Sequence, residues 1–290
     1  METKLCTGLT LTSPLYNASC PVAVTYKQLN EIDQSKSGAI LTKSCTLLPN
    51  ELKIHSKRYE YDLTTHTSYN QNELLNPGLD YYLKYKHKKE SKKPYIISVA
   101  LSDSDDYTKL VKQLNCSSKT FPQSIELNLS CPNHPDQTNS NYYQILADTL
   151  DLIEQNTVFM PILGLKLRPC IDISDIDLTV DLVRECPKIK YVVCTNTIPR
   201  GMSGSGYIGA IGGRSLKPVS LWNVYEYRRR LSSDIGIVGC GGVFNYNDFD
   251  HYIRTGATAV QIGTGIYEHG LDTIDTILDE SRRYKMKSNL

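Results

Sequence analysis

A cysteine flanked by two asparagines lies in the stretch 125–133, which reads Ile-Glu-Leu-Asn-Leu-Ser-Cys-Pro-Asn. Its first six residues alternate between apolar and polar, as in a β-strand, and Pro132 ends the strand because proline has no N–H to donate. Cys131 therefore follows a strand, with the amides of Asn128 and Asn133 nearby. A thiol whose pKa is lowered by a neighbour can remove a proton from carbon beside a carbonyl group. The alternative is a buried structural cysteine, the more common situation for a free thiol.

Polar residues also end other predicted strands. Lys43-Ser44 ends the first, Asn70 follows the second, Lys166 ends the fifth and Asn196-Thr197 follows the sixth. Two lysines would place positive charge against a ring such as that of a reduced flavin. The side-chain amides, which carry donors and acceptors, would bind the alternating N–H and C=O edge of a pyrimidine-like ring.

Glycines follow the last two predicted strands, as Gly239-Cys-Gly-Gly242 and Gly263-Thr264, and Gly212-Gly213 adds a third glycine segment. In α/β barrels the loops after strands seven and eight often bind phosphate, and glycine lets backbone N–H groups approach an anion closely. The alternative is a set of tight turns without a ligand. The sequence contains no Walker lysine motif, and the loop 201–213 does not match the dinucleotide-binding fingerprint.

Eight predicted strands, nearly all followed by a helix, are expected to position these residues. Short apolar or alternating runs predict strands at 38–43, 59–67, 94–101, 125–130, 161–167, 190–195, 234–239 and 257–262. Helical spacing predicts helices at 24–32, 79–89, 103–115, 142–155, 173–185, 216–231, 247–255 and 271–284.

This alternation predicts a parallel sheet, and eight strands favour a (β/α)8 TIM barrel over an open doubly wound sheet. The polar strand ends support the barrel, because barrel active sites lie at the carboxyl ends of the strands. We expect one domain over residues 1–290, with a short N-terminal cap at 1–36 and eight βα units at 37–290.

Composition narrows the class of protein. The formal net charge is +1, so no overall field favours nucleic acid or an acidic membrane. The basic run 84–93 is more typical of a solvated helix face than of a nucleic-acid patch. The 9 cysteines include no CxxC pair or zinc spacing, so we expect no metal site, no disulfide framework and a reducing, cytoplasmic location. We also expect no signal core and no membrane span.

The stretch 125–133 closely resembles the catalytic motif of the class 1 dihydroorotate dehydrogenases. The resemblance covers nearly the whole chain, and its pattern is most similar to class 1A, the cytosolic homodimers that pass electrons to fumarate. It rests on further segments at 17–19 (Asn-Ala-Ser), 37–44, 78–83, 164–167 (Gly-Leu-Lys-Leu), 195–197 (Thr-Asn-Thr), 213–218, 239–243 and 261–264.

This resemblance implies that FMN binds and that (S)-dihydroorotate is oxidised to orotate in pyrimidine biosynthesis. Cys131 would take the proton from C5 while hydride leaves C6 for the flavin, and fumarate, reduced to succinate, would reoxidise the flavin. The implied substrate contacts are Lys43, Asn70, Asn128, Asn133, Asn196 and Thr197. The implied FMN contacts are Ala18, Ser19, Lys43, Ser44, Asn128, Lys166, Val193, Gly212, Gly213, Cys240, Gly241, Gly242, Gly263 and Thr264.

Four features depart from the family pattern. The segment 70–76 reads Asn-Gln-Asn-Glu-Leu-Leu-Asn, which places Glu73 where the family has glycine. The loop after Cys131 lacks the family's Pro-Gly-Lys-Pro, the segment between Thr197 and Gly212 is shorter, and Cys20 replaces a glycine. These departures keep two alternatives open: an FMN-binding relative with a different substrate, and a non-catalytic binding protein.

Overall fold

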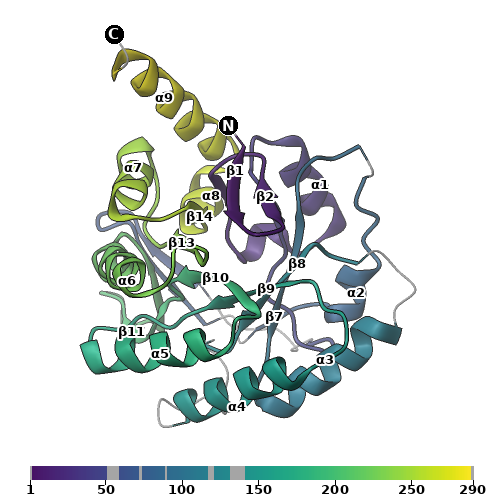
Figure 1. Cartoon of the computed structure of the whole chain (residues 1–290). Coiled ribbons are helices and arrows are strands. Elements are labelled where there is room, and N and C mark those ends of the chain that lie inside the picture. Colours follow the sequence, from purple (N-terminus) through teal and green to yellow (C-terminus); the bar gives the residue numbers. More distant parts are fainter. Residues whose placement is uncertain are drawn as a thin grey trace.

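Eight parallel strands curl into a barrel with helices around the outside (Figure 1). Around the barrel the strands follow the order β3, β4, β7, β8, β9, β10, β13 and β14. The expected TIM barrel is thereby confirmed. The structure is a computed structural model, and it describes residues 2–50, 59–71, 74–88, 90–116, 121–130 and 141–288.

The eight barrel strands are short, and most of their residues are buried. They are β3 (Leu15–Asn17), β4 (Ile40–Leu41), β7 (Tyr95–Ala100), β8 (Ser124–Asn128), β9 (Ile162–Lys166), β10 (Ile189–Cys194), β13 (Gly236–Cys240) and β14 (Ala259–Ile262). All six residues of β7 are buried, because a parallel strand between helices and barrel interior is covered on both faces.

Helices alternate with these strands and cover the barrel. They are α1 (Tyr26–Gln34), α2 (Leu79–Leu83), α3 (Ser104–Cys116), α4 (Tyr142–Gln155), α5 (Ile173–Glu185), α6 (Lys217–Arg230), α7 (Tyr246–Thr255), α8 (Thr264–His269) and α9 (Asp272–Ser288). Two short 3-10 helices occur at Pro21–Ala23 and Arg214–Leu216. The last helix, α9, extends outward past the barrel (Figure 1).

Strands β3 and β4 close the barrel, although no regular ladder joins them among the described residues. The side chain of Asn17 takes its place: Nδ2 donates to the carbonyl of Leu41 at 2.6 Å, and Oδ1 accepts from the N–H of Leu41 at 3.1 Å. The N–H of Gly38 also donates to the carbonyl of Leu15 at 2.8 Å. One buried amide side chain therefore acts as an additional peptide group in the barrel wall.

The chain begins with an antiparallel hairpin, β1 (Thr3–Cys6) and β2 (Leu9–Leu11), packed against the barrel. Its leucines are buried in one apolar cluster with residues of β10 and β13. Gly236 permits this close approach, since a Cβ there would lie 2.3 Å from the carbonyl oxygen of Leu5. The hairpin contacts the beginning of β13, so it covers the amino-terminal end of the barrel.

A second sheet of four antiparallel strands has the order β11 (Ile198–Met202), β12 (Ile208–Gly213), β6 (Thr67–Asn70) and β5 (Tyr59–Asp62). The segment 201–213, expected to be a loop, therefore forms most of a β-hairpin. Its strand β11 starts shortly after β10 ends, which places the sheet beside the carboxyl end of the barrel.

The sequence prediction assigned the first two barrel strands wrongly. The segment 59–67 forms β5, a turn and the first residue of β6 in the antiparallel sheet, and 38–43 contains the second barrel strand, β4. The first barrel strand is β3, inside the segment 1–36 expected to be a cap, so residues 37–290 do not contain eight complete βα units. Only three residues long, β3 is too short to show a periodicity. The apolar and polar residues that alternate in 59–67 are typical of an antiparallel strand with one face in solvent, and not of a buried barrel strand.

The predicted helix 79–89 is also too long, because α2 ends at Leu83. Beyond it Lys84, Lys86 and Lys88 are exposed, whereas Tyr85 is buried and His87 is half-buried. Exposed and covered side chains thus alternate at every second residue, as they do in an extended chain and not in a helix. The Tyr85 hydroxyl holds its side chain inward by donating to Asn30 Oδ1 at 2.9 Å.

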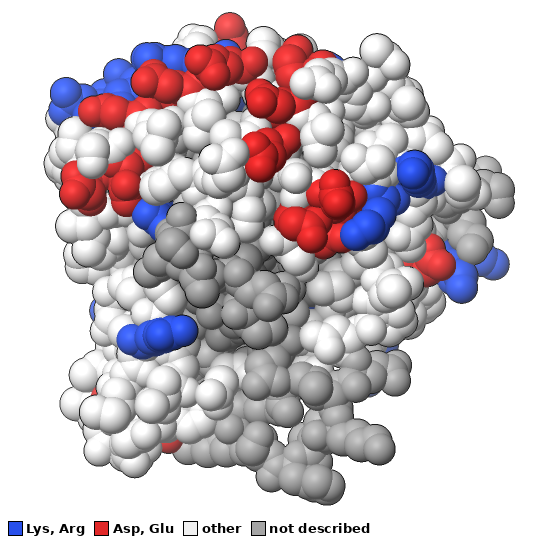
Figure 2. All heavy atoms as spheres, turned by 90° about the horizontal axis from the view of Figure 1, so that it is seen from below, with Lys and Arg blue, Asp and Glu red and all other residues white. Residues whose placement is uncertain are grey.

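The face formed by α3, α4 and α5 carries many acidic side chains (Figure 2). Exposed acidic residues on α4 and α5 include Asp148, Asp151, Glu154, Asp177 and Asp181. Such a face does not have the basic character that nucleic-acid binding requires. Within the described ranges, no helix is both long and apolar enough to cross a membrane.

Candidate active site

A pocket of about 1020 Å³, including its open mouth, lies at the carboxyl ends of the barrel strands. Residues at or just after the ends of β3, β4, β8, β9, β10, β13 and β14 line it, and strands β6 and β12 of the antiparallel sheet form a further wall. The position is that of active sites in TIM barrels.

Amides and hydroxyls form a continuous chain of hydrogen bonds across the pocket wall. Asn196 Nδ2 donates to Asn128 Oδ1 at 3.1 Å, and Asn128 Nδ2 donates to Ser44 Oγ at 3.2 Å. Ser44 Oγ lies 2.9 Å from Ser98 Oγ and donates to Ser19 Oγ at 3.2 Å. These contacts fix the orientation of both asparagine side chains, as a site that recognises a planar ring by hydrogen bonds needs.

Two lysines place positive charge in the same wall. Lys166 is 5% exposed and its Nζ donates to Ser19 Oγ at 3.4 Å, while Lys43 follows β4 and lines the pocket. Deeper in the barrel, the fully buried Glu126 accepts a hydrogen bond from Gln261 Nε2 at 2.7 Å. Burial raises the pKa of Glu126, and the Lys166 ammonium opposes that rise. The lysines therefore favour an anionic or electron-rich ligand in the pocket.

Glycines line one end of the pocket. A Cβ on Gly212 would lie 2.7 Å from Ser68 Oγ, and a Cβ on Gly242 would lie 2.7 Å from the Cβ of Lys217. Gly213 and Gly242 have φ of +72° and +63°, a conformation that other residues rarely adopt. Side chains are thus excluded here for steric and conformational reasons, and backbone N–H groups are left to meet a ligand.

Two cysteines, Cys20 and Cys240, contribute to the pocket lining. Burial raises the pKa of the Cys20 thiol to about 11 and also raises the pKa of Cys240, although the Lys166 ammonium opposes both shifts. At neutral pH both groups are therefore protonated thiols. They suit the wall of a binding site better than the role of a base or nucleophile.

An aromatic pair borders the pocket beside Thr264. The rings of Tyr59 and Tyr267 meet edge to face with centroids 4.7 Å apart, and both side chains line the pocket. The Tyr59 hydroxyl donates to Glu268 Oε1 at 2.5 Å, and burial together with this contact raises the pKa of Tyr59. The hydrogen bond fixes the ring of Tyr59 as an apolar wall.

Comparison with known proteins agrees with this geometry. The family model described as dihydroorotate dehydrogenase matches residues 1–284, nearly the full length of the chain. The chain belongs to the dihydroorotate dehydrogenase family. The resemblance seen in the sequence is thereby confirmed.

Several named dihydroorotate dehydrogenases are similar over most of their length. A probable dihydroorotate dehydrogenase A (fumarate) of Streptococcus pneumoniae is 33% identical over 287 residues, which cover 94% of this chain and 89% of the relative. The dihydroorotate dehydrogenase A (fumarate) of Lactococcus lactis is 32% identical over 283 residues, covering 92% and 89%. A ligand-free dihydroorotate dehydrogenase structure from Eimeria tenella has a TM-score of 0.80 at 20% identity and covers 99% of this chain and 88% of that one.

Most of the residues predicted from the dihydroorotate dehydrogenase motifs meet in this one pocket. They are Ala18, Ser19, Lys43, Ser44, Asn70, Asn128, Lys166, Asn196, Thr197, Gly212, Gly213, Cys240, Gly241, Gly242, Gly263 and Thr264. Val193 is fully buried in β10 and is not among the lining residues. Cys131, Asn133 and Glu73 lie outside the described residues, so their predicted roles stay predictions.

Sequence reasoning missed other lining residues. Cys20 was noted only as a departure from the family pattern and was not predicted to line the pocket. The others are Pro21, Tyr59, Ser68, Leu74, Thr195, Leu216, Val243, Gln261 and Tyr267. Ser68 was detectable in principle, because it precedes Asn70 by two residues and so lies on the same face of a strand. Tyr59 and Tyr267 are brought together from β5 and α8, and no local pattern indicates that contact.

Proposed function

We propose that this protein is an FMN-dependent dihydroorotate dehydrogenase, which oxidises (S)-dihydroorotate to orotate in pyrimidine biosynthesis and uses fumarate as electron acceptor. One observation carries the proposal: a single pocket contains two lysines, a hydrogen-bonded set of amides and a glycine-lined end. Membership of the family and the fumarate-linked names of its relatives support the same reaction.

The residues of the pocket fit FMN. Gly212, Gly213, Gly242 and Gly263 would hold the phosphate through backbone N–H groups, because the chain carries no side chains there that would shield the backbone. Lys43 and Lys166 would place positive charge beside the ring, and Ala18, Ser19, Ser44, Asn128, Val193, Cys240, Gly241 and Thr264 complete the proposed contacts. FMN supplies the acceptor for the hydride that leaves C6 of the substrate.

The substrate would bind against the amides, with its ring edge facing Asn128 and Asn196. Asn196 Oδ1 already accepts from the N–H of Thr197 at 2.9 Å, which orients the amide for a ligand. Lys43, Asn70, Asn133 and Thr197 are the other proposed contacts. Cys131 would remove the proton from C5, a step for which it must lie on the pocket side of the segment that follows β8.

Location and assembly are part of the proposal. We propose that residues 1–290 form one FMN-binding domain of class 1A type, that it acts in the cytoplasm and that it forms a homodimer. Its partners would be the small molecules dihydroorotate, orotate, fumarate and succinate, with no nucleic acid and no membrane.

Anaerobic spectroscopy tests this function. Purified protein should show flavin absorbance that dihydroorotate bleaches and fumarate restores. Protein that carries no flavin and takes up none would contradict the proposal and favour a non-catalytic binding protein. Flavin that another reductant bleaches but dihydroorotate does not would indicate an FMN enzyme with a different substrate.

The role of Cys131 has its own test. Cys131→Ser should slow flavin reduction by dihydroorotate by roughly 10²- to 10⁴-fold, the usual contribution of a general base, and should leave FMN bound. Cys116→Ser is the matched control, because Cys116 is an exposed thiol at the end of α3. Equal reduction rates in both variants would show that Cys131 is not the base.

A further inference from the structure

Helix α6 carries two buried polar side chains behind the wall of the pocket. Ser220 and Asn223 are fully buried, and their spacing of three residues places them on the same face of the helix. The helix packs against β10 and β13, two of the strands whose ends line the pocket. Neither side chain is among the lining residues. Because polar groups are seldom buried without hydrogen-bond partners, the partners of these two residues indicate what the helix does for the site.

Ser220 connects the ends of two barrel strands. Its Oγ donates to the carbonyl of Cys240 at 2.8 Å and lies 3.0 Å from Thr195 Oγ1. A serine hydroxyl has only one hydrogen, so Thr195 is the donor in the second contact. The N–H of Thr195 also donates to the carbonyl of Cys240, at 3.0 Å. Thr195 and Cys240 both line the pocket, so one buried hydroxyl joins the end of β10 to the end of β13.

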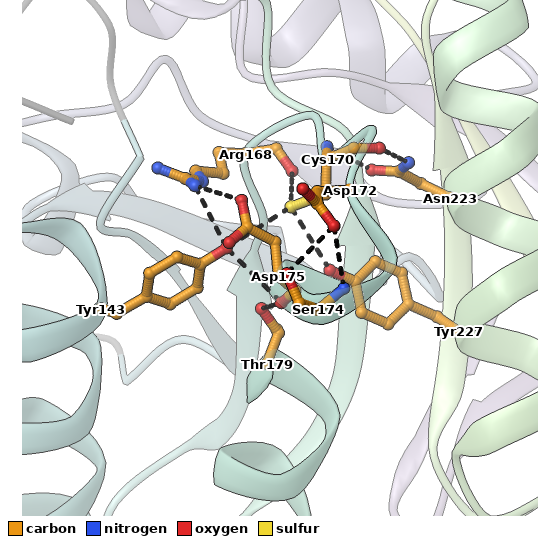
Figure 3. A network of polar contacts seen from close by, with 9 residues as sticks. All are labelled: Tyr143, Arg168, Cys170, Asp172, Ser174, Asp175, Thr179, Asn223 and Tyr227. Atoms are coloured by element: carbon orange, nitrogen blue, oxygen red, sulfur yellow. Dashed lines mark hydrogen bonds and ion pairs between the residues drawn. The ribbon is translucent and has the colours of Figure 1, made fainter. Parts of the chain in front are cut away.

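Asn223 holds the chain that follows β9. Its Oδ1 accepts from the N–H of Cys170 at 2.9 Å, and its Nδ2 donates to the carbonyl of the same residue at 2.5 Å. Figure 3 shows Asn223 directed toward Cys170, which also accepts a hydrogen bond at Sγ from the Tyr227 hydroxyl, at 3.8 Å. Three residues before Cys170, the carbonyl of Leu167 accepts from the N–H of Asn196 at 2.8 Å. Helix α6 therefore fixes the loop that receives the backbone of Asn196.

These two sets of contacts converge on the neighbouring residues Thr195 and Asn196. Ser220 holds the side chain of Thr195, and the loop held by Asn223 accepts the backbone N–H of Asn196. The Asn196 amide in turn donates to Asn128 Oδ1 at 3.1 Å. A shift of the Asn196 backbone would therefore move both amide side chains of the pocket wall.

We propose that Ser220 and Asn223 are positioning residues: from one face of α6 they hold Thr195 and Asn196, and so set where the amide wall meets a ligand. The inference rests on the proposed function only in naming that ligand as dihydroorotate or orotate. Neither residue touches the ligand, so each acts through the strand end or the loop that it holds.

The test compares variants of the full-length holoprotein. Ser220→Ala removes the bridging hydroxyl, and Thr195→Val removes the hydroxyl that it meets, whereas Thr195→Ser keeps that hydroxyl. The double variant Ser220→Ala/Thr195→Val shows whether the two hydroxyls act together. Asn223→Ala removes both hydrogen bonds to the backbone of Cys170. The control is Ser281→Ala, because Ser281 is also a buried serine on a helix, but on α9, which extends outward past the barrel.

Two measurements are made on each variant. The first is the dissociation constant of orotate, obtained from the change that orotate causes in the flavin absorbance. The second is hydrogen exchange of the backbone amides at 193–197, followed by mass spectrometry, which needs neither substrate nor enzyme activity.

We expect Ser220→Ala and Thr195→Val each to weaken orotate binding by roughly 3- to 10-fold, the usual effect of losing one hydrogen bond. Exchange at 193–197 should be faster by a similar factor. The double variant should lose no more than either single variant, and Thr195→Ser should keep most of the affinity. Asn223→Ala should lose at least as much as Ser220→Ala, and Ser281→Ala should match the wild type.

The outcomes separate this inference from the proposed function. Wild-type orotate affinity in Ser220→Ala and Asn223→Ala, together with a lower melting temperature, would show a purely structural role and overturn the inference. Wild-type exchange at 193–197 in both variants, or fully additive losses in the double variant, would also overturn it. If orotate leaves the wild-type flavin spectrum unchanged, the proposed function is contradicted, and the exchange rates alone decide on the positioning role. If Asn223→Ala does not fold, the variants of Ser220 and Thr195 decide.

Discussion

Glu126 is a carboxyl group with little solvation inside the barrel. It is fully buried, it accepts a hydrogen bond from Gln261 Nε2, and its Oε1 has no hydrogen-bond partner among the described residues. Tyr16 and Tyr191 lie close enough for a charge on Glu126 to raise their pKa values. The Lys166 ammonium and the hydrogen bond from Gln261 favour its ionised form, but burial outweighs both and raises the pKa of Glu126. The group therefore makes folding stability depend on pH.

The sign of that dependence follows from the raised pKa of Glu126. The folded state holds the proton of Glu126 more tightly than the unfolded state does. The contribution of Glu126 to stability is therefore fully present below the ordinary glutamate pKa of about 4.3 and is lost as pH rises through the folded pKa. Glu126→Gln removes this loss. Relative to the wild type, the free energy of unfolding of Glu126→Gln in urea should therefore rise with pH from about 4.3 upward, by about 1.4 kcal/mol per pH unit until the folded pKa of Glu126 is reached. Glu154→Gln, at an exposed position on α4, is the control. Parallel curves for wild type and Glu126→Gln would contradict this account.

Sequence reasoning found the residues of the site whose chemistry is unusual for their position. A lysine at the end of a buried strand, such as Lys43 or Lys166, and an asparagine such as Asn128 stand out because polar groups are rare there. Cys20 and Tyr59 did not stand out as contacts, since each is ordinary in its local sequence. Their place in the pocket depends on how distant segments pack, and a single sequence does not contain that information.

At the scale of elements, the prediction was accurate where packing imposes a simple pattern. The buried strands β7 to β10, β13 and β14 were found within two residues of their ends, and α4 and α5 were predicted with their observed bounds. It missed β3, which is only three residues long, and it took β4, which lies inside the predicted strand 38–43, for the first barrel strand instead of the second. Side-chain contacts replace part of the ladder there, and a hydrophobic pattern does not report side-chain contacts.

The side chain of Asn17 is important for stability, because its two hydrogen bonds to Leu41 replace the missing ladder between β3 and β4. Asn17→Ala would leave the N–H and the carbonyl of Leu41 without partners in a position that is fully buried. Each buried group that loses its partner costs about 1–3 kcal/mol, so the free energy of unfolding should fall by roughly 2–6 kcal/mol. Urea denaturation measures this change. Asn115→Ala removes an exposed asparagine that donates to Val111 on its own helix, and it should change stability little. Equal stability of the two variants would mean that Asn17 does not replace the ladder.

At the scale of the whole molecule, the proposed cofactor connects many elements. The pocket is lined from seven barrel strand ends and from the antiparallel sheet, so a bound molecule would stabilise contacts between segments distant in sequence. FMN at about 100 times its dissociation constant should add about 2.7 kcal/mol and raise the melting temperature of the apoprotein by roughly 5–10 °C. Riboflavin, which lacks the phosphate, should give a clearly smaller shift at the same concentration. Equal shifts would exclude the glycine-lined end as the phosphate site, and no shift with either would contradict FMN binding.

Strands β6 and β12 are paired without interruption from Thr67–Gly213 to Asn70–Ala210. Three residue steps of about 3.4 Å separate the glycine-lined end of this ladder from its amide end by about 10 Å. Backbone hydrogen bonds between β6 and β12 hold this distance fixed in the wall of the pocket. A ligand must therefore be about 10 Å long to contact both ends of this ladder at once.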